Sequence, residues 1–436
     1  MLLQRAAPSV GATSRPTVRA ARLGPIAAAV SRRTRRAQTE VVDDEEGVST
    51  PSGLSPDQKV KQRLLKDTIA NINKKHGANT VMQMSGSAIN VPRTPTGCLT
   101  LDKATGGGYP KGRIVEIFGP ESSGKTTLAM HAIAEVQKQG GIACFIDAEH
   151  AFDAVYATRL GININDLMVC QPDHGEMAFN VMDELVRSGV VNIIVVDSVS
   201  ALVPRAEVEG DIGTPQIGLQ ARLMSLALRK VTANAAKSGC TILFINQLRF
   251  KVGVLFGNPE TTSGGNALKF YSSMRLDIRA RDKITETGRV EPVGNRVKVK
   301  VVKNKVKVVK NKVSSPYEVA EFDIMYGEGI NSVGCVYDVA KEMGVIEARG
   351  SHIYFEGVKL AQGRDNVLAH LRDNPDTAAR LTTAVQAKLA EGAAQQASSG
   401  GSGSVEDDDV EGFADELRDD DAMAQELQDL ERDLDG

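Results

Sequence analysis

The chain has 436 residues, of which 42% are hydrophobic and 25% are charged, and its net charge is −3. This composition is typical of a soluble globular protein with two or three domains, and no apolar run reaches the roughly 18 residues of a membrane span. Five scattered cysteines without a CxxC pair and six histidines without an HExxH motif argue against a zinc site or a disulfide framework and favour a reducing compartment.

Both ends of the chain are strongly charged. Residues 1–39 contain eight arginines, no lysine and no acid, which is typical of an organellar transit peptide or of a basic arm that binds nucleic acid. Residues 404–436 contain fifteen acids and two arginines, a net charge of −13. Neither end can bury enough apolar surface to offset its ordering entropy, so we predict that both are disordered. The acidic tail either solubilises the protein or competes with nucleic acid for basic surface.

The first predicted element is a helix that begins near Ser55. Ser55 can cap it, Pro56 suits its first turn, and Asp57 lies near the positive end of the helix dipole. Apolar residues follow at helical spacing as far as Gly77, which can end the helix; they are Val60, Leu64, Leu65, Ile69 and Ile72. This stripe packs either on the protein's own core or on a neighbouring molecule.

From Arg113 onward, short apolar runs alternate with helical stretches. Four runs rich in isoleucine or valine predict buried strands: RIVEIFG, IACFID, VNIIVVDS and TILFINQ. Such an alternation predicts an α/β fold with a mostly parallel sheet covered by helices. After about Asn331 the pattern changes to helices with a few strand pieces, which indicates a small α+β domain.

A phosphate-binding motif, GxxxxGK[ST], lies between the first of these strands and the next helix. Its residues are Gly119, Pro120, Glu121, Ser122, Ser123, Gly124, Lys125 and Thr126, and we add the following Thr127 to the cofactor-binding set. The glycines allow backbone N–H groups to converge on phosphate oxygens at the start of a helix. We expect Lys125 to neutralise the β- and γ-phosphates and Thr126 to hold Mg²⁺.

Polar residues end the other strands. Asp197 follows an apolar strand, where it can be a second Mg²⁺ ligand or an ordinary helix cap. Asp147 and Glu149 lie two residues apart, so their side chains leave the same face, and one of them could polarise an attacking water. Gln247 ends the fourth strand, where a neutral amide can sense a γ-phosphate or be an ordinary strand-end residue.

Five stretches together resemble the bacterial RecA recombinase family: GRIVEIFGPESSGKTTL, FIDAEHA, VVDSVSAL, INQLR and FGNPETTSGGNALKFY. The resemblance extends from about residue 55 to about residue 390, and helicases or transporters with a phosphate loop do not carry the last stretch. It implies a DNA-strand-exchange ATPase that uses ATP and Mg²⁺. It also implies that Glu149 is the water-activating acid, that Gln247 is the nucleotide sensor, and that Asp153 and Tyr156 contact adenine.

Two glycine-rich segments, 207–218 and 251–266, resemble the DNA loops of the family. Arg222, Ser225 and Arg229 follow the first loop at i, i+3 and i+7, so one helix face presents two cations and a hydroxyl. Such a face suits a phosphate backbone, although it can also be a solvated charged face. Further positions that match the DNA contacts of the family are Arg249, Gly264, Gly265 and Asn266.

The heptapeptide VKVVKNK occurs twice in residues 299–312. In the family, one copy ends a core strand, and its last two lysines reach the ATP of the neighbouring subunit. Because the returning strand follows the second copy, we predict that residues 306–312 hold the native register and that Lys310 and Lys312 are these lysines. The first copy would then be a bulge, a loop or a frayed extension. A duplication in the gene model and a solvated edge that discourages strand pairing are the other interpretations.

The sequence therefore predicts a recombinase that forms a helical homo-oligomeric filament on single-stranded DNA and pairs it with double-stranded DNA. A ring-forming P-loop helicase and a DNA-coating protein that does not hydrolyse ATP are the alternatives. We expect a chloroplast location, because a bacterial-type recombinase suits a plastid of bacterial descent, with the mitochondrion as the alternative. The expected segments are a transit peptide and linker (1–50), a polymerisation segment (51–88), a RecA-type P-loop ATPase core (89–331), a small α+β domain (332–395) and a linker with the acidic tail (396–436).

Overall fold

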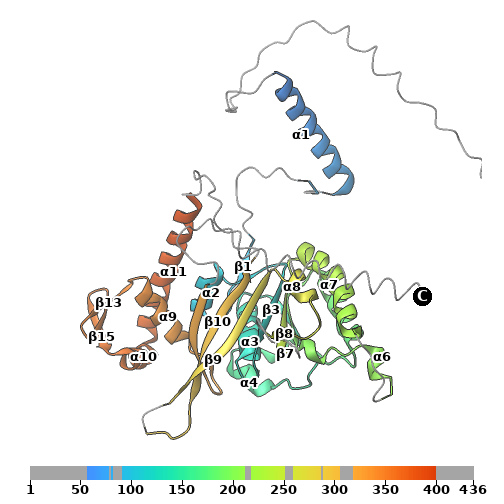
Figure 1. The fold of residues 1–436 in the computed structure, drawn as a ribbon. Coiled ribbons are helices and arrows are strands. Elements are labelled where there is room, and N and C mark those ends of the chain that lie inside the picture. The colour runs from blue at the N-terminus through green and yellow to red at the C-terminus, as the bar shows by residue number, and fades with distance from the viewer. Residues whose placement is uncertain are drawn as a thin grey trace, which may run out of the picture. The chain divides into compact units, whose positions relative to one another are not determined.

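Figure 1 shows the computed structural model, which describes residues 56–77, 80–81, 91–211, 218–250, 259–285, 288–304 and 318–398, the last six by their backbone alone. The chain divides into two compact units, residues 1–86 and residues 87–436. In the first unit, the predicted helix is confirmed as α1 (Pro56–His76), which ends directly before Gly77. No residue of α1 is buried within the unit, and Val60, Leu64 and Leu65 are exposed.

The second unit is built on one large mixed sheet. Its described strands have the order β12-β11-β10-β9-β3-β7-β6-β4-β5, and β8 pairs with β7. The strands from β9 to β5 run parallel to their neighbours, whereas β10, β11 and β12 are antiparallel. The bounds are β3 (Ile114–Gly119), β4 (Ile142–Asp147), β5 (Leu167–Cys170), β6 (Val191–Asp197), β7 (Thr241–Phe250), β8 (Glu260–Thr262), β9 (Met274–Ile284), β10 (Gly294–Asn304), β11 (Val319–Met325) and β12 (Gly329–Ile330).

Helices cover both faces of this sheet, as the alternating pattern predicts (Figure 1). In β6, Ile193 and Val195 join one buried cluster, while Ile194 and Val196 join another on the opposite face. The helical elements are α2 (Leu99–Thr105), α3 (Lys125–Lys138), α4 (Ala154–Arg159), η1 (Ile164–Asp166), α5 (Gly175–Ser188), η2 (Val199–Ala201), α6 (Arg205–Val208), α7 (Leu219–Ser238) and α8 (Ala267–Tyr271). A short separate sheet pairs β1 (Arg93–Thr94) with β2 (Tyr109–Pro110).

The C-terminal part of the second unit is the predicted small α+β domain. It consists of α9 (Ser332–Glu342), β13 (Ile346–Arg349), β14 (His352–Phe355), β15 (Val358–Gln362), α10 (Arg364–Asp373) and α11 (Pro375–Ser398) around a core of its own. The guanidinium of Arg364 donates to Asp338 of α9 and to the buried Asp323 of β11, at 3.0 Å each. This bridge fixes the domain to the large sheet. Within the described ranges, no helix has the length and apolar composition that a membrane span requires.

The structure corrects the prediction that the first copy of VKVVKNK lies outside the native strand as a bulge, a loop or a frayed extension; only a local shift in its pairing with β9, between Val301 and Lys303, is present. Residues 299–304 form the end of β10 and pair with β9, and Val299 and Val301 are buried at the period of a strand. The register is continuous from upstream, because β10 pairs with β11 without a shift from Gly294 to Lys300. Its pairing with β9 shifts between Asn295 and Val297 and again between Val301 and Lys303. The strand therefore reaches the repeat in register and the first copy continues it.

His131 is a buried histidine that holds the end of the sheet. Its Nε2 accepts a hydrogen bond from the backbone N–H of Ile330 at 3.0 Å, and the residue is 9% exposed. Burial, assisted by the charge of Lys138, lowers the pKa of His131 to about 4 from its ordinary value of 6.5. The folded chain therefore requires the neutral imidazole, which accepts at Nε2.

We predict that acidification destabilises the protein through His131. Because the pKa is lower in the folded state, the stabilisation is fully present above pH 6.5 and is lost as the pH falls toward 4. Between about pH 7.5 and about pH 5 the loss should be about 2 kcal/mol. The variant His131→Gln keeps an acceptor for Ile330 but cannot be protonated, so it should lose less. Urea unfolding of both proteins at the two pH values measures this difference, and equal losses would refute the role of His131.

Candidate functional site

The phosphate-binding loop connects β3 to α3, as the motif predicts. Gly124 caps α3 in the left-handed region, at φ 93°, and a Cβ there would clash with Ile324. A Cβ at Gly119 would likewise clash with the carbonyl oxygen of Ile278 on β9. Only glycine fits at these two positions, and the loop therefore lies tightly against the sheet. The first N–H groups of α3, which directly follow the loop, are a site where an anion can bind.

The loop offers a cation and an unsatisfied hydroxyl to an anion. Lys125 Nζ donates to the carbonyl oxygens of Gly119 at 3.1 Å and Pro120 at 2.6 Å. Burial lowers the pKa of Lys125, opposed by the nearby charges of Asp197, Glu149 and Glu121. Ser123 Oγ is one of three buried side-chain polar atoms that have no hydrogen-bond partner in the described part of the chain. Phosphate oxygens could satisfy both groups.

Thr126 and Asp197 form a pair of oxygen ligands beside the loop. Thr126 Oγ1 donates to Asp197 Oδ2 at 2.7 Å. Burial raises the pKa of Asp197 to about 6; the Thr126 hydrogen bond opposes the shift, and the charges of Glu149 and Asp147 increase it. A hydroxyl and a desolvated carboxylate next to a phosphate site are a donor set that fits Mg²⁺, which prefers oxygen ligands and shares them with phosphates.

The two carboxylates that follow β4 have different surroundings. Asp147 is buried and accepts hydrogen bonds from the backbone of Ala151 and Phe152 and from Gln171 Nε2. It therefore stabilises the turn after the strand. Glu149 is exposed and accepts from Gln247 Nε2 at 2.8 Å, and Ser198 Oγ donates to the same oxygen. The structure thus brings Glu149 together with Gln247 at the carboxyl edge of the parallel strands.

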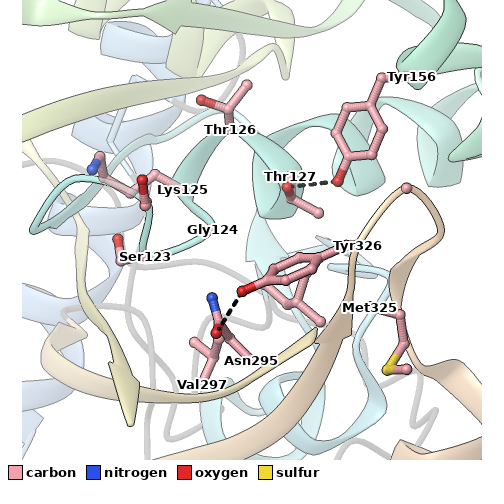
Figure 2. A pocket seen from close by; sticks show the side chains of 13 residues that line it. Ser123, Gly124, Lys125, Thr126, Thr127, Tyr156, Asn295, Val297, Met325 and Tyr326 are labelled. Carbon is pink, nitrogen blue, oxygen red and sulfur yellow. Dashed lines mark hydrogen bonds between the residues drawn. The ribbon is translucent and has the colours of Figure 1, made fainter. Parts of the chain in front are cut away.

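A cavity of about 380 Å³ adjoins the loop, within the size range of small-molecule sites. Figure 2 shows Tyr156 and Thr127 on one part of its wall and Tyr326 with Asn295 on another. Tyr156 Oη is 2.9 Å from Thr127 Oγ1, and Tyr326 Oη donates to Asn295 Oδ1 at 2.9 Å. Two tyrosine rings beside a phosphate loop suit a nucleotide base.

Asp153, which the resemblance implies as an adenine contact, caps α4 in this structure, and its contact with adenine stays a prediction. Its carboxylate caps α4 by accepting from the N–H groups of Val155 at 2.8 Å and Tyr156 at 3.0 Å. Its bond to the N–H of Tyr156 holds the start of the helix that carries this cavity-lining tyrosine. Sequence reasoning missed Asn295 and Tyr326. The only local signal for Tyr326 is an aromatic residue followed by glycine at the end of a strand.

The residues predicted to bind DNA gather around α7 and α8. Arg222 and Arg229 are exposed and Ser225 is half-buried, on a different face of α7 from the buried Met224 and Leu228. Gly264 and Gly265 lie between β8 and α8, where added Cβ atoms would contact Met224 and Ala221 of α7. Asn266 precedes α8, and Arg249 is exposed on β7 opposite Thr261 of β8. The loop residues 212–217 and 251–258 lie outside the described part of the chain.

The predicted interface lysines, Lys310 and Lys312, lie in residues 305–317, which the structure does not describe, and their role stays a prediction. In the first copy, Lys303 Nζ donates to the carbonyl oxygen of Lys269. Asn304 Nδ2 donates to the carbonyl oxygen of Thr105 at 3.2 Å. These bonds fix the end of β10 within its own chain.

Family models and known proteins match most of this chain. The family model of the RecA N-terminal domain matches residues 63–331, and that of the RecA C-terminal domain matches residues 334–390. The chain is 50% identical over 368 residues to Protein RecA of Gloeobacter violaceus, which covers 84% of this chain and 97% of the relative. It is 54% identical over 334 residues to Protein RecA of Synechococcus elongatus, and this match covers 76% of this chain and 91% of the relative. It is 51% identical over 357 residues to Protein RecA of Trichormus variabilis, and this match covers 82% of this chain and 97% of the relative.

We predict that Tyr326 contributes to nucleotide affinity through its ring. Tyr326→Ala removes one wall of the cavity and should weaken binding of an adenine nucleotide by about 1 kcal/mol or more, roughly fivefold in Kd. The matched variant Tyr326→Phe loses only the bond to Asn295 and should bind nearly as the wild type does. Titration with a fluorescent ATP analogue measures both, and an unchanged Kd in the alanine variant would exclude a contact with the base.

Proposed function

The chain belongs to the RecA family of DNA-dependent ATPases in recombination and repair, and from this premise we propose that it is an ATP-driven strand-exchange recombinase. It would polymerise on single-stranded DNA, pair this DNA with a homologous duplex and exchange the strands. The observation that carries the proposal is the position of β7. Gln247 of this strand donates to Glu149 beside the phosphate loop, and Arg249, two residues later, pairs with Thr261 of β8 directly before the predicted second DNA loop, so one strand would serve both ligands.

In this proposal, ATP occupies the cavity and its phosphates bind the loop. Lys125 would exchange its bonds to the loop carbonyls for the β- and γ-phosphates. Thr126 and Asp197 would hold Mg²⁺, which supplies positive charge to the phosphate oxygens. Glu149 would accept a proton from the attacking water, and Gln247 would divide its amide between Glu149 and the γ-phosphate. Hydrolysis would then change what Gln247 contacts.

Two features of the surface support a filament. Helix α1 exposes Val60, Leu64 and Leu65, and β5 is the last strand at one end of the sheet, with Met168 37% and Val169 44% exposed. A strand at the end of the sheet and an apolar stripe on a helix are different surfaces, so contacts between them in successive copies would be head-to-tail and need not close into a ring. Lys310 and Lys312 would reach the nucleotide of the neighbouring subunit.

A D-loop assay with and without ATP tests the proposed function. We expect the wild type to pair a single strand with a homologous duplex only when ATP is present. Lys125→Ala should abolish ATP-dependent filaments, because it removes the phosphate-binding charge. Glu149→Gln should bind ATP and lose turnover, because the amide cannot accept a proton. A polar duplex-unwinding activity without homologous pairing would indicate a helicase, and undiminished hydrolysis by Glu149→Gln would reject the role of this acid.

We also propose that the arginine-rich start of the chain directs the protein to an organelle, the chloroplast in preference to the mitochondrion. The support is the composition of residues 1–39, which contain eight arginines and no acid. We predict that the mature protein begins between about residues 30 and 50, where the composition changes. Sequencing the N-terminus of protein purified from its source measures this, and a mature chain that still begins at Met1 would contradict the proposal.

A further inference from the structure

A buried polar network lies directly behind the nucleotide sensor. Glu116 on β3 and Asn246 on β7 are both 0% exposed. Asn246 Nδ2 donates to Glu116 Oε1 at 3.0 Å and also to the carbonyl oxygen of Ser263 at 3.0 Å, and its Oδ1 accepts from the backbone N–H of Gln247 at 2.9 Å. On the other side, Arg275 Nε donates to Glu116 Oε2 at 2.6 Å, and its guanidinium lies 4.6 Å from the centre of the Phe118 ring.

The chemistry of its partners fixes the orientation of Asn246. The Glu116 carboxylate and the Ser263 carbonyl can only accept hydrogen bonds, so both must face the amide NH₂. The N–H of Gln247 can only donate, so it must face the amide oxygen. Asn246 therefore makes three hydrogen bonds that no apolar residue and no carboxylate could replace together. Because these groups are buried, leaving any of them without a partner is costly.

The three bonds join the two sites of this protein. Side chains alternate along a strand, so Gln247 is directed at Glu149 in the nucleotide site while Asn246 is directed at the opposite face. There it holds Ser263, which directly precedes the predicted DNA-contacting residues Gly264, Gly265 and Asn266. A shift of the backbone at Gln247 thus changes the hydrogen bond that holds the end of the second DNA loop.

We propose that Asn246, oriented by Glu116 and Arg275, is the positioning residue that couples the nucleotide sensor to the DNA-contacting turn 263–266. The proposal rests on the proposed function, and it deepens it by naming the connection between ATP and DNA. Asn246 touches neither ligand itself. It transmits a change at Gln247 to Ser263 through its amide group.

A reversal of donor and acceptor within the network tests the proposal in the full-length protein. Asn246→Asp alone would place two carboxylates side by side, and Glu116→Gln alone would turn an amide NH₂ toward a donor. In the double variant Asn246→Asp/Glu116→Gln, the introduced amide donates to the introduced carboxylate and accepts from Arg275. The introduced carboxylate still accepts from the backbone N–H of Gln247. The bond to the Ser263 carbonyl is then the one hydrogen bond that the network lacks, and the negative charge next to Arg275 moves from residue 116 to residue 246.

The measurements are the affinity for a fluorescent ATP analogue and the ratio of ATP hydrolysis rates with and without oligo(dT). We expect the double variant to bind the analogue as the wild type does, while the stimulation by DNA falls by about tenfold, a typical size for coupling between sites. If the double variant binds the analogue and also keeps the wild-type stimulation by DNA, the proposal is overturned and the network has a purely structural role. A wild type without any stimulation would overturn both the proposed function and this inference.

Hydrogen exchange of the wild type keeps the test decisive if the double variant does not fold. Binding of a non-hydrolysable ATP analogue, without DNA, should change the deuterium uptake of a peptide that covers residues 259–268. A peptide from β13–β14 in the C-terminal domain, distant in the chain from both sites, is the internal control. Unchanged uptake at 259–268 would overturn the proposal.

Discussion

The pairing of β3 with β7 is the constraint on which the candidate site depends. The two strands are parallel, and their register places Gly119, where the phosphate loop begins, beside Gln247. A shift by one residue would turn the amide of Gln247 to the other face of the sheet, away from Glu149. The register is specified strongly because both strands are buried on both faces, with Ile117 and Ile245 in one cluster and Ile114 and Ile242 in the other. Ordinary core packing thus sets the geometry of the site.

Negative charge gathers where these strands end, and each carboxylate is stabilised in a different way. Asp147 is satisfied by backbone N–H groups and an amide, and Glu149 by a hydroxyl and an amide. Asp197 has one hydroxyl and a pKa raised to about 6, first of all by burial. It is therefore the carboxylate that gains most from a cation, and Lys125 is a cation close to it that the chain itself provides. The arrangement is prepared for a metal ion bound together with an anionic ligand.

Features that depend on short stretches could be predicted from the sequence, whereas features that depend on distant strands could not. The phosphate loop and the four buried strands follow from local spacing, and the structure has each of them. The place of the first copy of the repeat was predicted incorrectly, because β10 already pairs with β11 from Gly294 onward and carries residues 299–304 into the sheet. Tyr326 and Asn295 were missed because only the sheet order places β10 and β11 beside the phosphate loop. The different surroundings of Asp147 and Glu149 depend on turns and strand neighbours that periodicity does not reveal.

The alternation of side chains along β7 explains how a single strand can serve two sites. Consecutive residues of a strand face opposite sides, so Gln247 and Asn246 have separate surroundings although they share a peptide bond. Gln247 meets Glu149, and Asn246 meets the buried network and Ser263. Beyond them, β7 continues past the edge of the parallel strands and pairs with β8, and the predicted second DNA loop joins these two strands. In the proposed coupling, the position of Gln247 next to Asn246, the last buried residue of β7, is what would let a small contact change reach residues 263–266.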